Sequence, residues 1–329
     1  KFHGTGPFEI ATGKKIVNPN APITYTEVFG NTVIELAKED ENIVAITAAM
    51  PDGTGLTPFS KEFPKRFFDV GIAEQHAVTA AAGMAAAGLN PVVAIYSTFM
   101  QRAYDSVMHD ICMQNLHVSL CLDRAGLVGD DGFTHHGVFD YAYLRSMPNM
   151  TVMAPKDEDE LRHMLKTAVG MNGPVAVRYP RGGDCGITES CWNGVSDVAC
   201  HRRGDAVTLV TYGTITNNML EAAAVLAKDG IEATVLRLQK VAPLPVDEVI
   251  RLMAANRPVV VVEETCTGSG IQEALAWELR KRLPECRVCG MDLGGKYVTH
   301  GSMNALYKHC GLDAQSIFAY VKEVLANES

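Results

Sequence analysis

The sequence has no excess of basic charge. Among its 329 residues, 29 lysines and arginines are outnumbered by 38 aspartates and glutamates, which gives a net charge of −9. Nucleic acids and anionic membrane surfaces attract cationic proteins, so we expect neither as the main partner. Residues 1–15, KFHGTGPFEIATGKK, also lack the apolar core of a secretory signal. These absences predict a cytoplasmic protein that binds neither nucleic acid nor membranes.

The cysteines lack the spacing of a disulfide framework. There are nine, an odd number, scattered along the chain, which suits a reducing compartment. Cys286 and Cys289 form the only C-x-x-C, inside a strand-like run, and residues three apart in a strand point to opposite faces. We therefore expect neither a metal site nor a redox pair in this chain.

A long hydrophobic run of the kind that spans a membrane is also missing. Residues 77–100 carry no charge, but Asn90 and Pro91 interrupt them, and the part before is mostly alanine and glycine. A membrane helix needs about 20 consecutive apolar residues. This stretch instead predicts a helix of small residues followed by a buried strand.

Helical and strand patterns alternate along the chain, which is typical of α/β domains with mainly parallel sheets. The length favours two domains, and the alternation lapses after Gly182 before a second series begins. The predicted fold is thus two consecutive α/β domains. Their expected boundaries are a lead-in segment at 1–20, a first domain at 21–181, a linker at 182–204 and a second domain at 205–329.

The expected strands are short apolar runs bounded by polar residues or glycine. They lie at 42–49, 66–70, 91–97, 118–123, 151–155 and 174–179 in the first domain, and at 206–213, 232–238, 258–265 and 286–291 in the second. Amphipathic helices are expected at 26–39, 156–169 and 313–325.

Ligands of open parallel sheets bind beyond the carboxyl ends of the strands. Ionisable and aromatic side chains follow several predicted strands, namely Glu74, Tyr96, Phe99, Arg102, Arg124, Asp131, His135, Arg178 and Arg181. Guanidinium groups match the geometry of a phosphate, so arginines on one rim favour a phosphate ligand, although any one of them could make a structural ion pair. Glu74 could instead have only a structural role, because a carboxylate interacts favourably with the positive end of a helix dipole. His135 and His136 could be a metal pair, but adjacent loop residues rarely chelate together.

Five stretches together resemble one enzyme family. They are FFDVGIAEQHAVTAAAGMAAAG, PVVAIYSTFMQRAYDSVMHD, DRAGLVGDDGFTHHGVFD, AVRYPRG and YVTHGSMNALYKHCGLD. They closely resemble the 1-deoxy-D-xylulose-5-phosphate synthases, which belong to the thiamine-diphosphate-dependent, transketolase-like enzymes. The resemblance covers nearly the whole chain. It implies that the two domains are a pyrimidine-binding domain and a transketolase C-terminal domain.

The resemblance also implies roles for residues. Glu74 would hydrogen-bond N1′ of the cofactor's aminopyrimidine and promote the imino tautomer that removes the C2 proton of the thiazolium. Phe99 would pack on the aminopyrimidine, with Ile72 beside it. His3 would act catalytically near the reacting carbon, and His135 would also be catalytic, at the oxygens of the acceptor. The substrate-binding set would be Tyr96, Arg102, Asp131, His135 and Arg181, with Arg124 a further candidate; Arg178 would only support the strand end.

The implied reaction condenses pyruvate with D-glyceraldehyde 3-phosphate, releases CO2 and forms 1-deoxy-D-xylulose 5-phosphate, a precursor of isoprenoids, thiamine and pyridoxal. Such enzymes normally begin with a domain that holds the diphosphate through Mg²⁺ and a G-D-G motif, and this sequence contains no G-D-G. The resemblance therefore implies thiamine diphosphate as cofactor, with Mg²⁺ held by an N-terminal domain that lies in cis or on a cleaved fragment. It further implies a homodimer, and an isolated chain that is inactive.

Other readings of the same residues remain open. An ordinary transketolase-type subunit or a 2-oxoacid dehydrogenase beta-type subunit would share the fold and the glutamate, and the latter would explain a chain without the diphosphate domain. The chain could also be a non-enzymatic scaffold fragment. The presence of Glu74, Asp131 and His135 argues against the scaffold.

Overall fold

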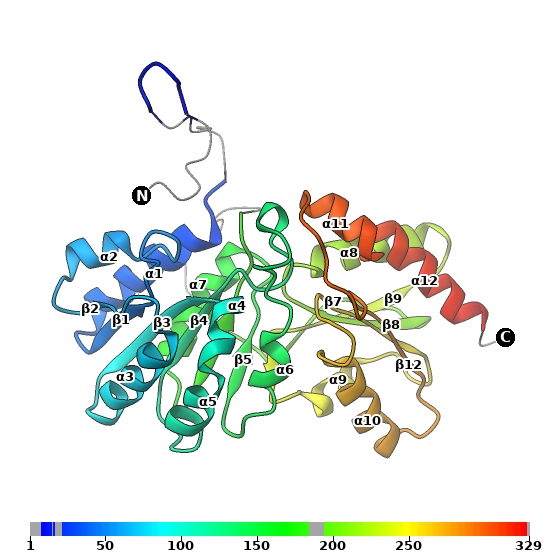
Figure 1. The fold of residues 1–329 in the computed structure, drawn as a ribbon. Coiled ribbons are helices and arrows are strands. Elements are labelled where there is room, and N and C mark those ends of the chain that lie inside the picture. Colours follow the sequence, from blue (N-terminus) through cyan, green and yellow to red (C-terminus); the bar gives the residue numbers. More distant parts are fainter. Residues whose placement is uncertain (1–7, 15, 17–21, 184–193, 328–329) are drawn as a thin grey trace.

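The computed structural model describes residues 8–14, 16, 22–183 and 194–327. Within these ranges the strands form two sheets, one of seven strands and one of five, which lie side by side with helices packed around them (Figure 1). Almost all strand pairs are parallel. The predicted fold class is therefore confirmed.

The larger sheet has the order β10-β5-β6-β4-β3-β1-β2. Only β10 runs antiparallel, against β5. Strands β1, β4 and β6 are buried along their whole length, as expected of a parallel sheet covered on both faces. The strands are β1 (Ile43–Thr47), β2 (Phe67–Asp69), β3 (Asn90–Tyr96), β4 (Ser119–Asp123), β5 (Thr151–Met153), β6 (Val175–Arg178) and β10 (Lys240–Ala242).

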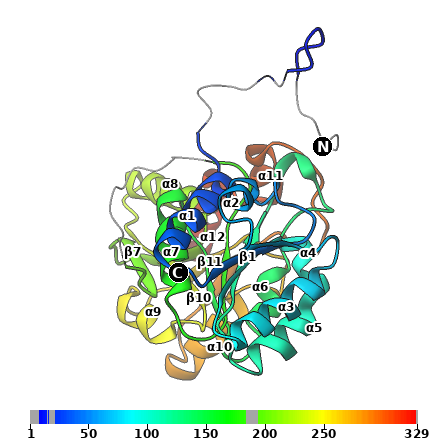
Figure 2. The same ribbon diagram turned by 90° about the vertical axis from the view of Figure 1, so that its left-hand side faces the viewer.

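Helices cover both faces of this sheet, with α1 and α7 on one face and α3 and α5 on the other (Figure 2). The helical elements are α1 (Tyr25–Glu39), α2 (Thr57–Glu62), α3 (Glu74–Ala86), α4 (Ser97–Met100), η1 (Gln101–Ala103), α5 (Tyr104–Ser106), η2 (Val107–Cys112), η3 (Gly129–Asp131), α6 (Asp140–Leu144) and α7 (Glu158–Val169). The uncharged stretch 77–100 forms most of α3 and all of β3, as predicted.

Helix α1 begins at a capping box. The Thr24 hydroxyl accepts a hydrogen bond from the Glu27 backbone N–H, and the Glu27 carboxylate accepts one from the Thr24 backbone N–H. These two bonds satisfy donors that a helix start leaves free. Because Thr24 is the cap, the hydroxyl of Thr26 is left for another partner.

The smaller sheet has the order β12-β11-β8-β9-β7, with β7 antiparallel to β9. Its strands are β7 (Val198–Arg202), β8 (Val207–Tyr212), β9 (Ala233–Leu238), β11 (Val259–Val262) and β12 (Val288–Met291). Its helices are α8 (Thr216–Lys228), α9 (Val246–Leu252), α10 (Gln272–Arg282), α11 (Met303–Cys310) and α12 (Ala314–Ala326). The segment 182–204, expected as a linker, thus contains a strand of this sheet.

The two sheets share a continuous apolar core. The rings of Tyr141 and Tyr212 lie 5.6 Å apart across the junction, and the Tyr141 hydroxyl donates to the Val241 carbonyl at 2.8 Å. The Glu160 carboxylate of α7 accepts hydrogen bonds from Arg237 and Gln239 of the second unit. Packing and buried polar contacts therefore join the two units.

None of the helices in the described ranges has both the length and the apolar character needed to cross a membrane. The seven cysteines that fall within those ranges are free thiols.

Candidate active site

Glu74 is the first residue of α3 and only 2% exposed. Its side chain does not cap the helix, because the N-cap is Ala73 and no side-chain cap bond is present there. Among the described residues its Oε2 has no hydrogen-bond partner. A buried polar atom without a partner is costly, and such atoms are rare in folded proteins. The carboxyl is thus buried, does not cap the helix, and has one oxygen without a hydrogen bond from a described residue.

The one cation beside this carboxyl is Arg102, as far as the described residues extend. Its Nη1 lies 3.2 Å from Oε2 of Glu74 and 3.4 Å from Oε1, where it donates a long hydrogen bond. The Arg102 side chain is 51% exposed and comes from the turn η1. The arginine is thus half exposed, whereas the carboxyl that it pairs with is buried.

Three aromatic rings form a row beside the strand ends. Tyr96 closes β3, and its ring stacks on Phe99 of α4 with centroids 5.7 Å apart. Phe99 in turn meets the His135 ring edge-on at 5.5 Å, and His135 Nδ1 lies 2.8 Å from the Thr134 hydroxyl. Three of the sequence-predicted residues are therefore brought together.

Arg124 lies against the end of this row. Its guanidinium sits over the Tyr96 ring, 4.1 Å from the centroid, and only 14% of its side chain is exposed. Burial raises the pKa of the Tyr96 phenol, and Arg124 opposes the shift only in part. The phenol therefore keeps its proton at neutral pH and can donate it to a ligand oxygen.

Asp131 and Arg181 form an ion pair at 3.3 Å, with both side chains at least one-third exposed. They lie close enough to Tyr96 for their charges to act on its pKa. The loop that carries Asp131 and His135 is closed at its base, where Gly126 and Gly137 exchange two backbone hydrogen bonds of 2.8 Å. A Cβ on Gly137 would come within 2.3 Å of the Arg124 carbonyl, so only glycine fits this closure.

Two neighbouring residues have structural roles instead. The Nδ1 atom of His136 accepts a bond from the Val128 backbone N–H, which leaves Nε2 to donate to the Thr299 carbonyl. Burial lowers the pKa of this imidazole. Arg178 makes two 3.0 Å hydrogen bonds to Asp140, so it supports the strand end as expected.

Two predicted residues remain, Ile72 and His3. Ile72 precedes Glu74 by two residues, and its side chain is 75% exposed. His3 lies outside the described residues.

Three residues that contact the cluster were not predicted from the sequence. Thr26 and Asp123 bind Arg124 from behind, and the Gly53 carbonyl accepts a bond from it. Gly53 also has to be glycine, since a Cβ there would lie 2.3 Å from the Tyr96 hydroxyl. The sequence signal that could have indicated this role is the capping box at Thr24 and Glu27. It makes Thr24 the helix cap, so the Thr26 hydroxyl is available for another partner.

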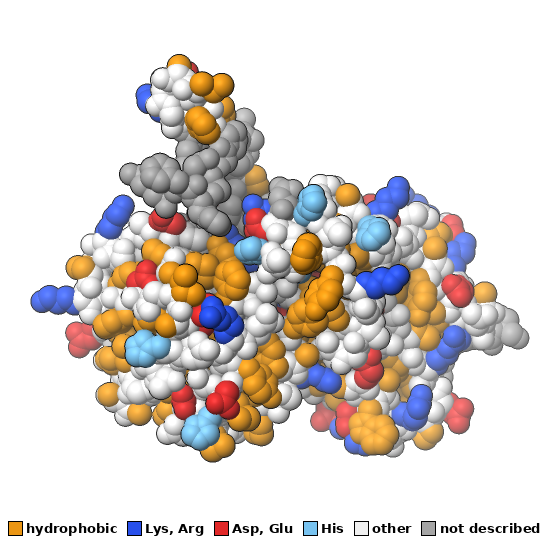
Figure 3. All heavy atoms as spheres, in the orientation of Figure 1, with side chains coloured by type: hydrophobic (Ala, Val, Ile, Leu, Met, Phe, Trp, Pro, Cys, Tyr) orange, Lys and Arg blue, Asp and Glu red, His pale blue; other side chains and the backbone are white. Residues whose placement is uncertain are grey.

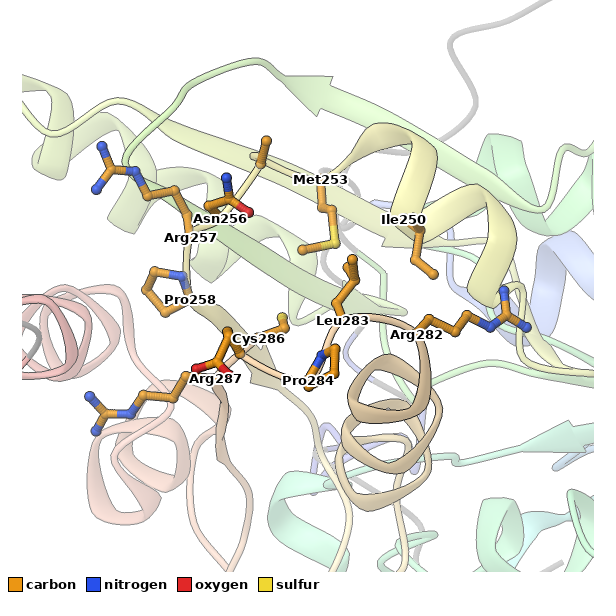
Figure 4. Close-up of a pocket in the computed structure, with 12 residues that line it drawn as sticks. Ile250, Met253, Asn256, Arg257, Pro258, Arg282, Leu283, Pro284, Cys286 and Arg287 are labelled. Atoms are coloured by element: carbon orange, nitrogen blue, oxygen red, sulfur yellow. The ribbon is translucent and has the colours of Figure 1, made fainter.

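A cavity in the second unit lies elsewhere. It measures about 590 Å³ and opens beside the amino ends of β11 and β12, away from the strand ends that carry the cluster above. Its three arginines point outward from the apolar middle formed by Met253, Leu283 and Cys286 (Figure 4). They do not converge on a common point, and nothing about their geometry selects a ligand.

Within the described ranges, no three histidine, cysteine or acidic side chains are placed to hold a metal ion. On the face shown in Figure 3, acidic and basic side chains are interspersed over the surface.

Two family models match the chain. The pyrimidine-binding domain of transketolase matches residues 21–183, and the transketolase C-terminal domain matches residues 196–317. Among solved structures, a split-gene transketolase described as an inactive β4 tetramer is 30% identical, with a TM-score of 0.79 over 93% of this chain and 99% of that one. The transketolase of Campylobacter jejuni, 18% identical with a TM-score of 0.75 over 92% of this chain and 46% of its own, shares the fold.

Several curated relatives of this chain are 1-deoxy-D-xylulose-5-phosphate synthases. A 1-deoxy-D-xylulose-5-phosphate synthase of Geobacter sulfurreducens is 52% identical over 99% of this chain and 52% of its own length. That of Heliobacterium modesticaldum is 47% identical over 98% of this chain and 50% of its own. The chain thus spans about half the length of the curated relatives it matches. It belongs to the transketolase-like family, and over half of their length it is similar to the 1-deoxy-D-xylulose-5-phosphate synthases.

Proposed function

We propose that this chain supplies the pyrimidine-binding half of an active site that condenses pyruvate with D-glyceraldehyde 3-phosphate. The reaction releases CO2 and forms 1-deoxy-D-xylulose 5-phosphate. The observation that carries the proposal is the Glu74 carboxyl, which is 2% exposed and has one oxygen without a hydrogen bond among the described residues. The family of its relatives supplies the identity of the reaction.

The residues around Glu74 fit the aminopyrimidine of thiamine diphosphate. Oε2 makes no hydrogen bond to a described residue, so it can bond to a ring nitrogen once the exposed Arg102 turns aside. The half-buried Phe99 offers a ring on which a pyrimidine can stack. When bound, this cofactor would supply the electron sink for decarboxylation. The role proposed for Glu74 is to bond N1′ and to hold or share the proton there. Ile72 would contact the same ring from the segment before α3.

The substrate end of the site is proposed on the far side of the aromatic row. Arg124 and Arg181, with the Tyr96 hydroxyl, would bind the phosphate of the aldehyde substrate. Asp131 and His135 would meet its hydroxyl and carbonyl oxygens. Arg102 would serve both ends, because it is exposed and lies beside Glu74. His3 would act near the reacting carbon.

The site is proposed to be completed by a diphosphate-binding part that holds the Mg²⁺, on a longer chain or on a separate one. In this arrangement residues 1–20 lead in from that part, 21–181 form the pyrimidine-binding domain, and the C-terminal domain begins with β7 instead of at residue 205. The split-gene relative, described as inactive, supports a chain that does not act alone. We further propose a homodimer that acts in the cytoplasm, and the free thiols fit a reducing compartment.

A transketolase-type subunit is the second candidate, favoured by the 99% coverage of the split-gene transketolase. The two candidates differ in the donor. A synthase releases CO2 from pyruvate, whereas a transketolase takes a two-carbon unit from a ketose phosphate without losing CO2.

The test is thiamine-diphosphate-dependent CO2 release from pyruvate, measured with the chain alone and with the chain assembled with its diphosphate-binding part. We expect activity in the assembly only. In the assembly, Glu74→Gln should lower kcat by about 10²–10⁴-fold, since general acid–base catalysis contributes that much. The exposed Glu41→Gln is the matched control. CO2 release by the chain alone, or full activity of Glu74→Gln, would contradict the proposal.

A further inference from the structure

Arg124 is held from one side only. Its Nη1 lies 2.9 Å from Oδ2 of Asp123, 3.1 Å from the Thr26 hydroxyl and 2.8 Å from the Gly53 carbonyl. All of its hydrogen bonds to described residues pass through this one nitrogen, and its buried Nε has no partner there. Nη2 is thus left for a ligand.

Asp123 and Thr26 are themselves fixed. Asp123 is the last residue of β4 and fully buried, and its Oδ2 accepts a 2.8 Å bond from the Thr26 hydroxyl. Thr26 stands in the first turn of α1, whose start is fixed by the Thr24 capping box. The Thr26 hydroxyl therefore donates to the carboxylate and accepts from the guanidinium, which joins a helix and a strand end behind one arginine.

The front of the guanidinium is shaped as well. The Tyr96 ring lies against its flat face, and Gly53 leaves just enough room for the Tyr96 hydroxyl. Arg124 has φ of 63°, a conformation unusual for a residue with a side chain. A local backbone cost of this kind persists where the surroundings over-determine the geometry.

We infer that Thr26 and Asp123 are positioning residues, which fix Nη1 of Arg124 so that Nη2 meets a phosphate oxygen of the aldehyde substrate. This inference rests on the proposed function and deepens it. A fixed guanidinium loses less freedom when it binds, so the network lowers the concentration of phosphorylated aldehyde that the site requires.

The experiment compares Thr26→Val with Thr26→Ser in the assembled enzyme. Valine keeps the shape and loses the hydroxyl, whereas serine keeps the hydroxyl. We expect Thr26→Val to raise the KM for D-glyceraldehyde 3-phosphate by about 3- to 10-fold, the effect of one hydrogen bond. The KM for pyruvate should change less than twofold, and Thr26→Ser should restore the wild-type value. Thr167→Val, on α7 far along the chain, is the matched control, because it removes a hydroxyl that bonds the His163 carbonyl.

Unphosphorylated D-glyceraldehyde separates the inference from the proposed function. Thr26→Val should have little effect on the KM for this acceptor, because no phosphate is present to meet Arg124. An equal rise in KM for both aldehydes, or no rise for either, would overturn the inference while the condensation itself still stands. A wild-type assembly that condenses neither aldehyde with pyruvate would overturn the proposed function and the inference with it. Asp123→Asn gives a second test, in which the KM values for the phosphorylated and the unphosphorylated aldehyde are compared in the same way.

Discussion

At the scale of single residues, two charged side chains of the site, Glu74 and Arg124, are only partly hydrogen-bonded. Among the described residues, Oε2 of Glu74 makes an ion pair with Arg102 but no hydrogen bond, and Nε of Arg124 makes none either. Arg124 is otherwise held by Asp123, Thr26 and the Gly53 carbonyl, whereas Glu74 is buried and paired with the exposed Arg102. Rigid groups with a free polar atom are what a binding site needs, since a ligand then completes the hydrogen bonding without a large loss of freedom.

His136 gives a pH dependence at the same scale. Burial lowers the pKa of its imidazole, while Asp131 opposes and His135 adds to the shift. In the unfolded chain the imidazole takes up a proton near pH 6.5. Below pH 6.5 the unfolded state binds more protons than the folded one, so the free energy of unfolding decreases as the pH falls. Above about pH 6.5 this contribution to stability is fully present.

We therefore expect urea unfolding to show lower stability at about pH 5.5 than at about pH 7.5, and this difference to shrink in His136→Gln. Glutamine can still accept from Val128 and donate to Thr299. The exposed His309→Gln should keep the wild-type difference. Equal pH dependence in His136→Gln and the wild type would show that another group is responsible.

Residue types at strand ends could be predicted from the sequence, but their pairing could not. The pattern placed Glu74, Tyr96, Arg124 and Asp131 at one edge of a sheet. It could not show that Arg102 lies beside Glu74 instead of with the other arginines, because that depends on the turn η1. Thr26 was missed for a similar reason, as its partner Asp123 is 97 residues away.

At the scale of elements, buried strands were predicted well because continuous apolar runs are a strong signal. Strands β1, β3, β4, β8 and β11 all fall within the expected ranges apart from a residue at one end. Strands β7 and β10 were not predicted, since one has the sequence VACHR and the other has three residues. Edge strands of this kind carry little periodic signal. The turns and short helices between Ser97 and Cys112 likewise have no single period.

The Arg178–Asp140 pair links β6 to the start of α6, with side chains 5% and 0% exposed. Removing one partner leaves an uncompensated buried charge, which costs about 3–5 kcal/mol. We expect Arg178→Met to lower the free energy of unfolding by that amount in chemical denaturation. Lys281→Met, which breaks an exposed pair with Glu278, should cost less than about 1 kcal/mol. Similar losses in the two variants would mean that the buried pair is not an important contact.

At the scale of the whole molecule, Glu160 connects the two units. Arg237 donates to its Oε2 at 2.6 Å, the Lys156 backbone N–H at 2.8 Å, and Gln239 bonds its other oxygen. We expect Glu160→Ala to cost about 3–5 kcal/mol and to separate the calorimetric unfolding of the chain into two steps.

The control for this experiment is Lys322→Met, which breaks an exposed ion pair with Asp229 inside one unit. It should leave a single transition with a nearly unchanged midpoint. A single, unshifted transition in Glu160→Ala would show that apolar packing alone couples the units.

Strand β10 has a consequence for how the protein can be divided. Residues 240–242 come after most of the second sheet's strands in the sequence, yet they pair with β5 and close one edge of the first sheet. A fragment that ended near residue 204 would expose the backbone N–H and C=O groups of β5, and open strand edges of this kind recruit other chains. The pyrimidine-binding unit expressed by itself should accordingly be prone to self-association. In the whole chain, the three residues of β10 cover the edge of β5 and prevent this.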